Sequence, residues 1–197
     1  MRLTPWIVVA IVLFALWRLY SQRDISHQAG VLAEADPEQV ELEGAAIHRG
    51  EFTLRPRAGF SATVRILRRE DYSMGPFARL VPTDFAVGWG PMSDSAVLQG
   101  IEISQSNRFY FWRTDSWPLS REQIESHSAN WHVIPGSAAV RSTLEHLRVG
   151  SVIELQGQLV DIESQEGGMT TSLSRRDTGP GACEILLASS ARVLERQ

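Results

Sequence analysis

The sequence contains no lysine, because all 19 basic side chains are arginine. Without a lysine amine, Schiff-base catalysis is excluded, and so is a P-loop with its phosphate-binding lysine. Only one cysteine, Cys183, is present. A single cysteine excludes an intramolecular disulfide and any zinc or iron–sulfur site that needs several cysteines.

Basic charge is also scarce over most of the chain. Arg2, Arg18 and Arg23 precede the first acidic residue, Asp24. The other 16 of the 19 arginines lie in the same part of the chain as all 23 acidic residues. From Asp24 onward the chain therefore has a formal charge of −7. Nucleic-acid-binding domains usually carry a basic excess on the binding face, so this balance disfavours nucleic acid as a partner. A length of 197 residues with 43% hydrophobic residues predicts one globular domain and an appendage.

The appendage is an uncharged run at the N-terminus, LTPWIVVAIVLFALW, from Leu3 to Trp17. As a helix it would span about 22 Å, and continuation to Tyr20 brings it close to the ~30 Å of a bilayer core. Trp6 and Trp17 lie where interfacial aromatics are expected. We therefore predict a membrane anchor over residues 1–23, with a single transmembrane helix as its core at 3–20.

The alternative for this segment is a cleavable signal peptide. The nearest A-x-A pattern, Ala33–Ala35, lies well beyond the usual distance from the apolar run, so an uncleaved anchor is favoured. A very short tail before such a segment usually stays in the cytoplasm. We expect a bacterial inner-membrane protein with a periplasmic C-terminal domain.

After the anchor, residues 24–43 are polar and acidic, which predicts a linker to a β-rich globular domain at 44–197. Alternating apolar and polar residues predict strands at 51–55 and 60–67. Strands are also predicted at 97–104 and 109–113, joined through the turn-prone pair Ser106–Asn107, at 151–162, and at the apolar stretch 183–194. For the stretch 126–134, a strand at 130–134 and a loop at 126–130 are both considered. Capping chemistry predicts a short helix at 83–87, and an apolar stripe predicts an amphipathic helix between Ser137 and Gly150.

This order of elements indicates an α+β, β-dominant domain. Gly157, in the middle of a predicted strand, is typical of the bend in a small closed barrel. We expect a small, strongly bent OB-like or SH3-like β-barrel with one amphipathic helix.

Four segments carry a resemblance to known sequences: GWGPMSD (Gly88–Asp94), ISQSNRFYFWR (Ile103–Arg113), SHSANWHVIP (Ser126–Pro135) and SLSRRDTGPGACE (Ser172–Glu184). Together they resemble a family of uncharacterised bacterial membrane-anchored proteins. The resemblance covers most of the chain after residue 43. It implies a bacterial origin and transfers no activity, ligand or site residue.

Two histidines, His127 and His132, raise the question of a metal site. If both lie on one strand, their odd separation places them on opposite faces, where they cannot chelate one ion. If residues 126–130 form a loop instead, the two histidines could converge, with Cys183 or a carboxylate completing the site. Their spacing is not a zinc signature either. We expect scaffold roles for both histidines, and no metal or other cofactor.

The catalytic candidates are Cys183 and His132, which could form a thiolate–imidazole pair with Asn130 orienting the ring. The alternative is that Cys183 is buried, since it begins an apolar strand and free cysteine is among the most buried residue types. Both interpretations stay open at this point.

The binding candidates are Tyr110 and Trp112, which share one face of a predicted strand, and Arg175, Arg176 and Asp177, which precede a glycine-rich turn. Aromatic rings and guanidinium groups suit a binding face, although such arginines can simply brace a loop. The leading hypothesis is a non-catalytic envelope module that binds a protein, peptide or glycan. The alternative is an envelope hydrolase or thiol enzyme that uses Cys183 with His132.

Overall fold

The computed structural model describes residues 6–7, 9, 12–13, 23–42 and 44–194. The strands are β1 (Glu38–Glu41), β2 (Ile47–Arg49), β3 (Phe52–Asp71), β4 (Thr83–Gly88), β5 (Glu102–Ser106), β6 (Phe109–Arg113), β7 (Ser128–Pro135), β8 (Val152–Ser164), β9 (Gly167–Met169) and β10 (Glu184–Leu194). The helices are the 3-10 turn η1 (Gly90–Ser93), α2 (Ser95–Leu98), α3 (Arg121–Ser126) and α4 (Ala138–Glu145). The prediction of an α+β, β-dominant domain is confirmed.

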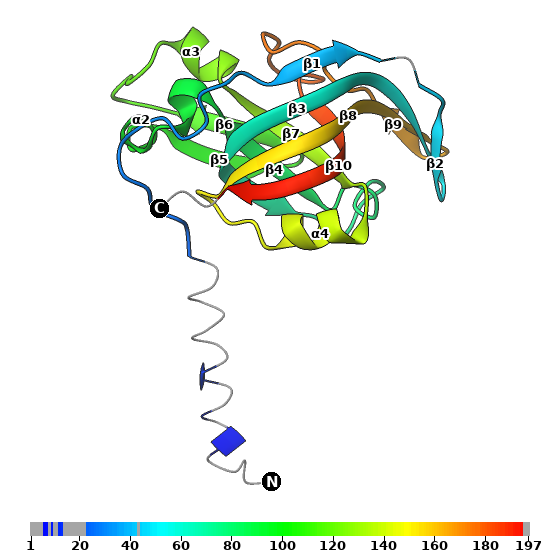
Figure 1. Cartoon of the computed structure of the whole chain (residues 1–197), viewed down its shortest axis with the longest axis horizontal. Coiled ribbons are helices and arrows are strands. Elements are labelled where there is room, and N and C mark those ends of the chain that lie inside the picture. The colour runs from blue at the N-terminus through cyan, green and yellow to red at the C-terminus, as the bar shows by residue number, and fades with distance from the viewer. Residues whose placement is uncertain (1–5, 8, 10–11, 14–22, 43, 195–197) are drawn as a thin grey trace.

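Eight of the strands form one mixed sheet, and β5 and β6 form a separate hairpin. In the main sheet, β3 pairs with both β4 and β8, so the path β3–β4–β7–β10–β8 returns to β3. Only the pairing of β7 with β10 is parallel. Figure 1 shows α2, α3 and the hairpin gathered at one end of the sheet, and β2 and β9 at the other.

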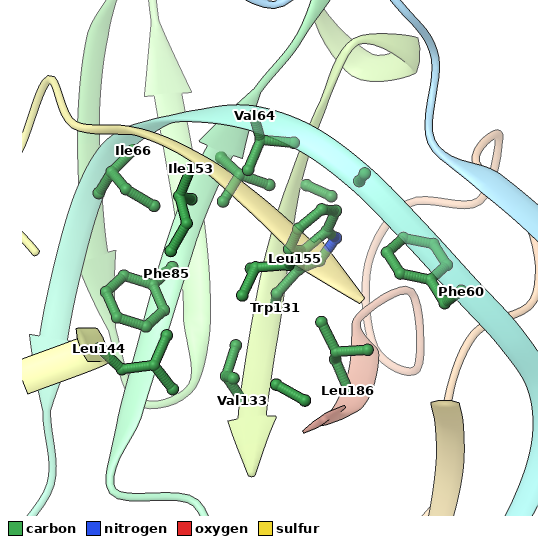
Figure 2. Close-up of a cluster of buried hydrophobic side chains, with 14 of the residues drawn as sticks. Phe60, Val64, Ile66, Phe85, Trp131, Val133, Leu144, Ile153, Leu155 and Leu186 are labelled. Atoms are coloured by element: carbon green, nitrogen blue, oxygen red, sulfur yellow. The ribbon is translucent and has the colours of Figure 1, made fainter. Parts of the chain in front are cut away.

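The hydrophobic core lies between the strands of this path. Trp131 occupies its middle, with the Phe60 ring edge-on at 5.3 Å and the Trp89 ring stacked at 6.4 Å between centroids. Figure 2 shows Trp131 and Leu155 surrounded by side chains from β3, β4 and β10. Burial of these large side chains, each worth about 1.5–3 kcal/mol, drives the curvature of the sheet around them.

A second apolar cluster lies beneath the hairpin and positions the site. Ala86 on the opposite face of β4 packs with Met92, Ile101 and Ile124, and the half-buried Tyr110 and Trp112 of β6 cover it. Because β6 alternates, Phe109 and Phe111 point away from this cluster and are exposed. The hairpin thus presents two phenylalanine rings beside the start of β7.

Two predicted strands, 51–55 and 60–67, are in fact parts of the single 20-residue strand β3. Pro56 lies inside this strand, where the prediction placed a break. The register with β8 shifts between Pro56 and Ala58, and such an irregularity accommodates a residue that lacks an N–H.

The predicted helix at 83–87 is wrong, because these residues form β4. All six residues of β4 are buried between β3 and β7. The Thr83 hydroxyl, expected to cap a helix, donates to Asp71 at 2.7 Å. Pairing on both edges overrides the local capping signal.

The predicted strand at 97–104 begins too early. Asp94 accepts a hydrogen bond from the Ala96 amide and starts the short helix α2, so β5 begins at Glu102. The hairpin turn is Asn107–Arg108, one residue later than expected, and both have positive φ, at 52° and 70°. Positive φ at both central positions is typical of a type I′ hairpin turn.

The amphipathic helix is confirmed as α4, with the Ser137 side chain accepting from the Val140 amide. Val140 and Leu144 are buried against the core, as the apolar stripe predicts. The strands predicted at 109–113, 151–162 and 183–194 are confirmed as β6, β8 and β10, and residues 130–134, for which a strand was one of two alternatives, lie in β7.

The segment predicted as a linker, 24–43, contacts the domain at several points within its described residues, 24–42. Strand β1 pairs with β3, and Ala33 is fully buried in the core. The Ala33 amide donates to the Ser93 hydroxyl at 3.0 Å, and Trp89 Nε1 donates to Asp36 at 2.9 Å. Partners from the folded domain thus satisfy these polar groups, while the division into linker and domain at residue 43 stays a prediction.

Most of the predicted anchor, residues 3–20, lies outside the described residues. No helix in the described ranges is long and apolar enough to cross a membrane. The anchor, its orientation and the periplasmic location of the domain remain predictions.

Candidate functional site

A pocket of about 460 Å³ opens between β6, the start of β7 and the loop 170–183 that leads into β10. Its lining residues are Trp89, Phe109, Tyr110, Phe111, Trp112, Arg121, Glu125, Ser128, Ala129, Asn130, Ser174, Arg175, Asp177, Thr178, Gly179, Ala182, Cys183 and Glu184. Segments more than 70 positions apart in the sequence therefore meet in one concave site.

The structure brings most of the predicted binding residues to this pocket. Tyr110, Trp112, Arg175 and Asp177 all line it. Arg176 does not, and its amide donates to the Ser174 hydroxyl within the loop. Asp177 accepts from the Ser172 hydroxyl at 2.7 Å, which helps to shape the loop.

Two of the three catalytic candidates, Cys183 and Asn130, also lie in the pocket wall. Asn130 Nδ2 donates to the Arg108 carbonyl at 3.0 Å and lies 3.8 Å from the Cys183 sulfur. Asn130 Oδ1 accepts from Gln105 at 2.7 Å. Both ends of the Asn130 amide are thus held by the hairpin, so Asn130 is fixed beside the sulfur. Among the described residues, the Asn130 side chain contacts Gln105, Arg108 and Cys183 and makes no hydrogen bond to His132, which it was expected to orient.

His132 lies behind the pocket wall and is almost fully buried. Its Nδ1 is 2.9 Å from Oδ1 of Asp84, which has no exposed surface. The ring N–H is not aligned with the carboxylate, so this contact is an ion pair rather than a directed hydrogen bond. Asp84 pairs directly with His132 across β4 and β7, which accounts for the contact.

Burial and the surrounding charges act in opposite directions on His132. Burial is the strongest single influence and lowers the pKa, but Asp84 and Cys183 together outweigh it and raise the pKa to about 9. The imidazole is therefore held in its charged form at neutral pH. It is a buried cation balanced by a buried carboxylate.

Arg108, at the hairpin turn, completes the buried network. Its guanidinium donates to Asp84 at 2.9 Å and to the Val81 carbonyl at 3.1 Å. It also stacks 3.7 Å from the centroid of the Tyr72 ring, and its amide donates to the Tyr72 hydroxyl. These contacts hold the hairpin turn next to Asp84, and Arg108 provides Asp84 with a second positive partner besides His132.

Glu184 is the least expected member of the pocket. It is only 4% exposed, and its Oε2 finds no hydrogen-bond partner among the described residues. Burial, followed by repulsion from Asp177, raises the pKa of Glu184 to about 8. At neutral pH this carboxyl is mostly protonated, so it can both donate and accept a hydrogen bond inside the pocket.

His127 and His132 belong to different local structures. His127 precedes β7 and ends α3, with its Nδ1 2.9 Å from the Gln123 carbonyl and its ring against Trp89. The expected placement on opposite faces of one strand therefore does not arise. Within the described ranges, no group of three or more His, Cys, Asp or Glu side chains could hold a metal ion.

Sequence reasoning missed Asp84, Arg108 and Glu184. Two of them carried a readable signal, because Asp84 and Glu184 are single charges within or beside apolar runs that form buried strands. A charged residue is rarely buried without a partner or a function. Arg108 carried no such signal, since only the folded hairpin brings it to Asp84.

Glu184 predicts a pH dependence of stability. Its raised pKa means that its stabilising contribution is complete below its unfolded value near 4.5 and is lost as the pH rises towards 8. Between pH 5 and 6.5 we expect the wild type to lose about 2 kcal/mol of unfolding free energy, and Glu184→Gln to lose almost none. Urea unfolding at both pH values measures this. Equal slopes for the two proteins would contradict the assignment.

Comparison with known proteins adds no further constraint. No protein-family model, curated protein or solved structure matches the chain. The function is therefore inferred from the pocket and the network behind it.

Proposed function

We propose that this protein is a membrane-anchored module of the bacterial envelope that binds a glycan in the pocket between β6, β7 and the loop 170–183. One observation carries the proposal. The lining of a cavity of about 460 Å³ combines aromatic side chains with the carboxyl group of Glu184. This carboxyl group is buried, and its Oε2 has no hydrogen-bond partner among the described residues. Cavities of this size, mostly apolar with a few fixed polar groups, are typical of small-ligand sites.

The chemistry of the walls suits a sugar ring. Phe109, Phe111 and Trp112 offer flat apolar faces on which the C–H face of a sugar can stack. Asn130 and Arg175 offer N–H groups to hydroxyl oxygens, and Glu184 can accept from or donate to a hydroxyl. A glycan would thus provide the partner that Glu184 lacks.

The topology supports the same ligand class by analogy. We infer an OB-like barrel from the path β3–β4–β7–β10–β8, with its parallel pair β7–β10 and with α4 between β7 and β8. OB folds bind oligonucleotides or oligosaccharides on their second and third strands and the loop between the fourth and fifth. Here β7 and the loop between β8 and β10 line the pocket. The formal charge of −7 after the anchor favours the oligosaccharide.

The anchor is the part of the proposal that rests on sequence alone. Residues 3–20 would tether the domain to the inner membrane, and a periplasmic domain would face envelope glycans. Because residues 24–42 contact the domain, the pocket would be held close to the membrane surface.

Phe111→Ala tests the pocket as the binding site. Phe111 is 54% exposed, so its loss should leave the fold intact. Loss of one stacking face, worth about 1–1.5 kcal/mol, should weaken glycan binding roughly tenfold. The assay titrates full-length protein in detergent with soluble envelope oligosaccharides and follows tryptophan fluorescence, since Trp89 and Trp112 line the pocket.

The matched control is Met74→Ala, which removes another exposed apolar side chain, 85% accessible and outside the pocket lining. It should bind like the wild type. Saturable binding of peptides and of no oligosaccharide would replace the glycan with a peptide ligand. Binding that Phe111→Ala leaves unchanged would move the site away from this pocket.

A further inference from the structure

We propose that the pocket selects an amino sugar whose amine carries no acyl group, and that Glu184 recognises the ammonium group of that sugar. The inference deepens the proposed function and rests on it for the sugar, because a glycan can present amines as well as hydroxyl groups. The recognition of a cation follows from three features of the pocket: the position of Glu184, the charges of the lining, and the aromatic rings beside them.

Glu184 lies where the hydrophobic core opens into the pocket. It precedes Leu186 by two residues in β10, so both side chains point to the same face of the strand. Leu186 packs in the same core cluster as Trp131, as Figure 2 shows. Trp89 and Ala129 belong both to this core and to the pocket lining. The carboxyl group of Glu184 is therefore at the inner end of the pocket.

This carboxyl group lacks a complete set of partners from the protein. Glu184 is only 4% exposed, and its Oε2 has no hydrogen-bond partner among the described residues. A buried polar group without a partner is costly, and a buried charge without a partner is more so. A ligand that places a donor at this point removes that cost when it binds. The most favourable donor for a carboxylate is a charged one.

The charges of the lining leave one carboxyl group in excess. Arg121 and Glu125 form an ion pair, with 2.8 Å between Nε and Oε1. Arg175 then stands against both Asp177 and Glu184, which line the same pocket. A ligand with one positive charge completes the balance, whereas an anionic ligand would increase the negative excess. Charge complementarity therefore favours a cation.

The aromatic side chains favour an organic cation over a metal ion. Phe109, Phe111 and Trp112 line the pocket together with the carboxyl groups. The face of an aromatic ring attracts an ammonium group, and it also packs against the C–H face of a sugar. A metal ion such as Ca²⁺ instead takes about 6–8 oxygen ligands, which aromatic rings do not supply. An ammonium group attached to a sugar ring uses both kinds of wall.

An acetylated amine would fit this chemistry less well. Acetylation removes the positive charge and puts an amide with a methyl group in its place. Glu184 would then gain at most a hydrogen bond between neutral groups, and bonds to ionised partners are roughly twice as strong. The pocket should therefore discriminate between glucosamine and N-acetylglucosamine, which differ in this group alone.

The charge of Glu184 should change when the ammonium group binds. Burial, followed by repulsion from Asp177, raises the pKa of Glu184 to about 8, so without a ligand the carboxyl group is protonated at pH 6. The amine of an amino sugar resembles an α-amino group, whose pKa is about 7.7–8.0, and is itself protonated at that pH. The ammonium group lowers the pKa of Glu184, so the carboxyl group loses its proton to solvent. Binding at pH 6 should release about 0.5–1 proton per ligand.

Other titratable groups face Glu184 from the neighbouring elements. Arg175 in the loop and His132 on β7 are positive and lower the pKa of Glu184. Tyr110 on β6 senses the charge of Glu184, but burial raises the pKa of its phenol, which stays neutral. Cys183 precedes Glu184 and lines the same pocket. Proton release from Glu184 itself is identified by its loss in Glu184→Gln.

The first experiment compares two β-1,4-linked tetrasaccharides, one of glucosamine and one of N-acetylglucosamine, by isothermal titration calorimetry with full-length protein in detergent at pH 6. The wild type should bind the glucosamine tetrasaccharide roughly tenfold or more tightly than the acetylated one. Equal affinities, or a preference for the acetylated sugar, would overturn the proposal, and this comparison needs no variant.

Glu184→Gln keeps the shape of the side chain and should bind both tetrasaccharides with affinities within about threefold of each other. The matched control is Glu163→Gln, because Glu163 lies outside the pocket lining, in an exposed pair with Arg55. This control should keep the preference of the wild type. A Glu184→Gln protein that also keeps the preference would show that another group recognises the amine.

The second experiment repeats the titration with glucosamine tetrasaccharide in two buffers of different ionisation enthalpy, which gives the number of protons released. The wild type and Glu163→Gln should release about 0.5–1 proton per ligand at pH 6, and Glu184→Gln almost none. Proton release that persists in Glu184→Gln would come from a different group and would overturn the role of Glu184.

The two proposals can fail separately. If both tetrasaccharides bind equally and Phe111→Ala weakens both, the pocket binds glycans without selecting an amine, and only the further inference fails. If tetralysine binds, depends on Glu184, and neither tetrasaccharide binds, the ammonium group belongs to a peptide, which overturns the amino sugar and the glycan together. The tetrasaccharide and tetralysine titrations of the wild type distinguish these outcomes.

Discussion

Replacing Asp84 with asparagine should lower the unfolding free energy by about 3–5 kcal/mol at pH 6. The substitution keeps the shape of the side chain and removes its charge. Asp84 has no exposed surface and balances both His132, at 2.9 Å, and Arg108, at 2.9 Å. A buried cation without its counter-charge is among the most costly defects in a folded protein.

The loss should depend on pH in a defined direction. In the wild type, the raised pKa of His132, about 9, means that its stabilising contribution is complete below about pH 6.5 and disappears as the pH approaches 9. In Asp84→Asn, burial is opposed by Cys183 alone, so His132 should become neutral at a much lower pH. The difference between the two proteins should therefore be largest at pH 6 and smallest near pH 9.

Urea unfolding at pH 6, 7.5 and 9 measures this difference. The matched control is Asp71→Asn, which removes an equivalent charge from the pair with Arg69, a pair whose carboxylate lies at the surface and whose Arg69 side chain is 21% exposed. The Asp71 side chain is 59% exposed, so this change should cost at most about 1 kcal/mol, with little pH dependence. A cost for Asp84→Asn that equals the cost for Asp71→Asn would show that the buried network contributes no special stability.

The second large effect is expected at Gly157. Gly157 lies in β8 opposite Phe60 of β3 and Ala188 of β10, in the middle of three paired strands. A Cβ added at Gly157 would collide with the carbonyl oxygen of Leu187 on β10. Backbone atoms of a central strand cannot yield as a side chain can. Gly157→Ala should therefore cost about 3 kcal/mol or more.

Gly59→Ala is the matched control, because Gly59 lies in β3 within the same ladder, opposite Gln158. A Cβ at Gly59 would approach only the exposed Val40 side chain, at 2.8 Å from its Cγ2. Because Val40 can move, this change should cost less than about 1 kcal/mol. Thermal unfolding of both variants gives the comparison. A Gly157→Ala protein as stable as Gly59→Ala would mean that β8 and β10 separate easily at this point.

The sequence predicted the fold class because the relevant signals are local. Short apolar stretches between turn residues predicted β6, β8 and β10, and the apolar stripe after Ser137 predicted α4. The same local signals misled where tertiary pairing dominated. Residues 83–87 carry a capping pattern, yet they are buried between β3 and β7 as β4.

The candidate site was predictable only in part. Tyr110, Trp112, Arg175 and Asp177 were chosen for their chemistry, and the structure places all four in one pocket. Arg176, chosen by the same reasoning, lies outside the lining. Neighbouring residues in a loop point in different directions, so composition alone cannot separate Arg175 from Arg176.

By itself, the sequence determined the absence of lysine chemistry and of intramolecular disulfides, the acidic balance after residue 23, and a β-dominant domain with one amphipathic helix. These properties depend on composition and on spacing along the chain. Tertiary structure alone decided that Asp84 on β4 meets His132 on β7 and that Asn130 Nδ2 lies 3.8 Å from the sulfur of Cys183 in the pocket wall. Strand pairing decides which side chains become neighbours, because it joins residues at long sequence separations. The same pairing also determines the burial that raises the pKa of Glu184, and it places Asp84 where it helps to raise the pKa of His132 against the effect of burial.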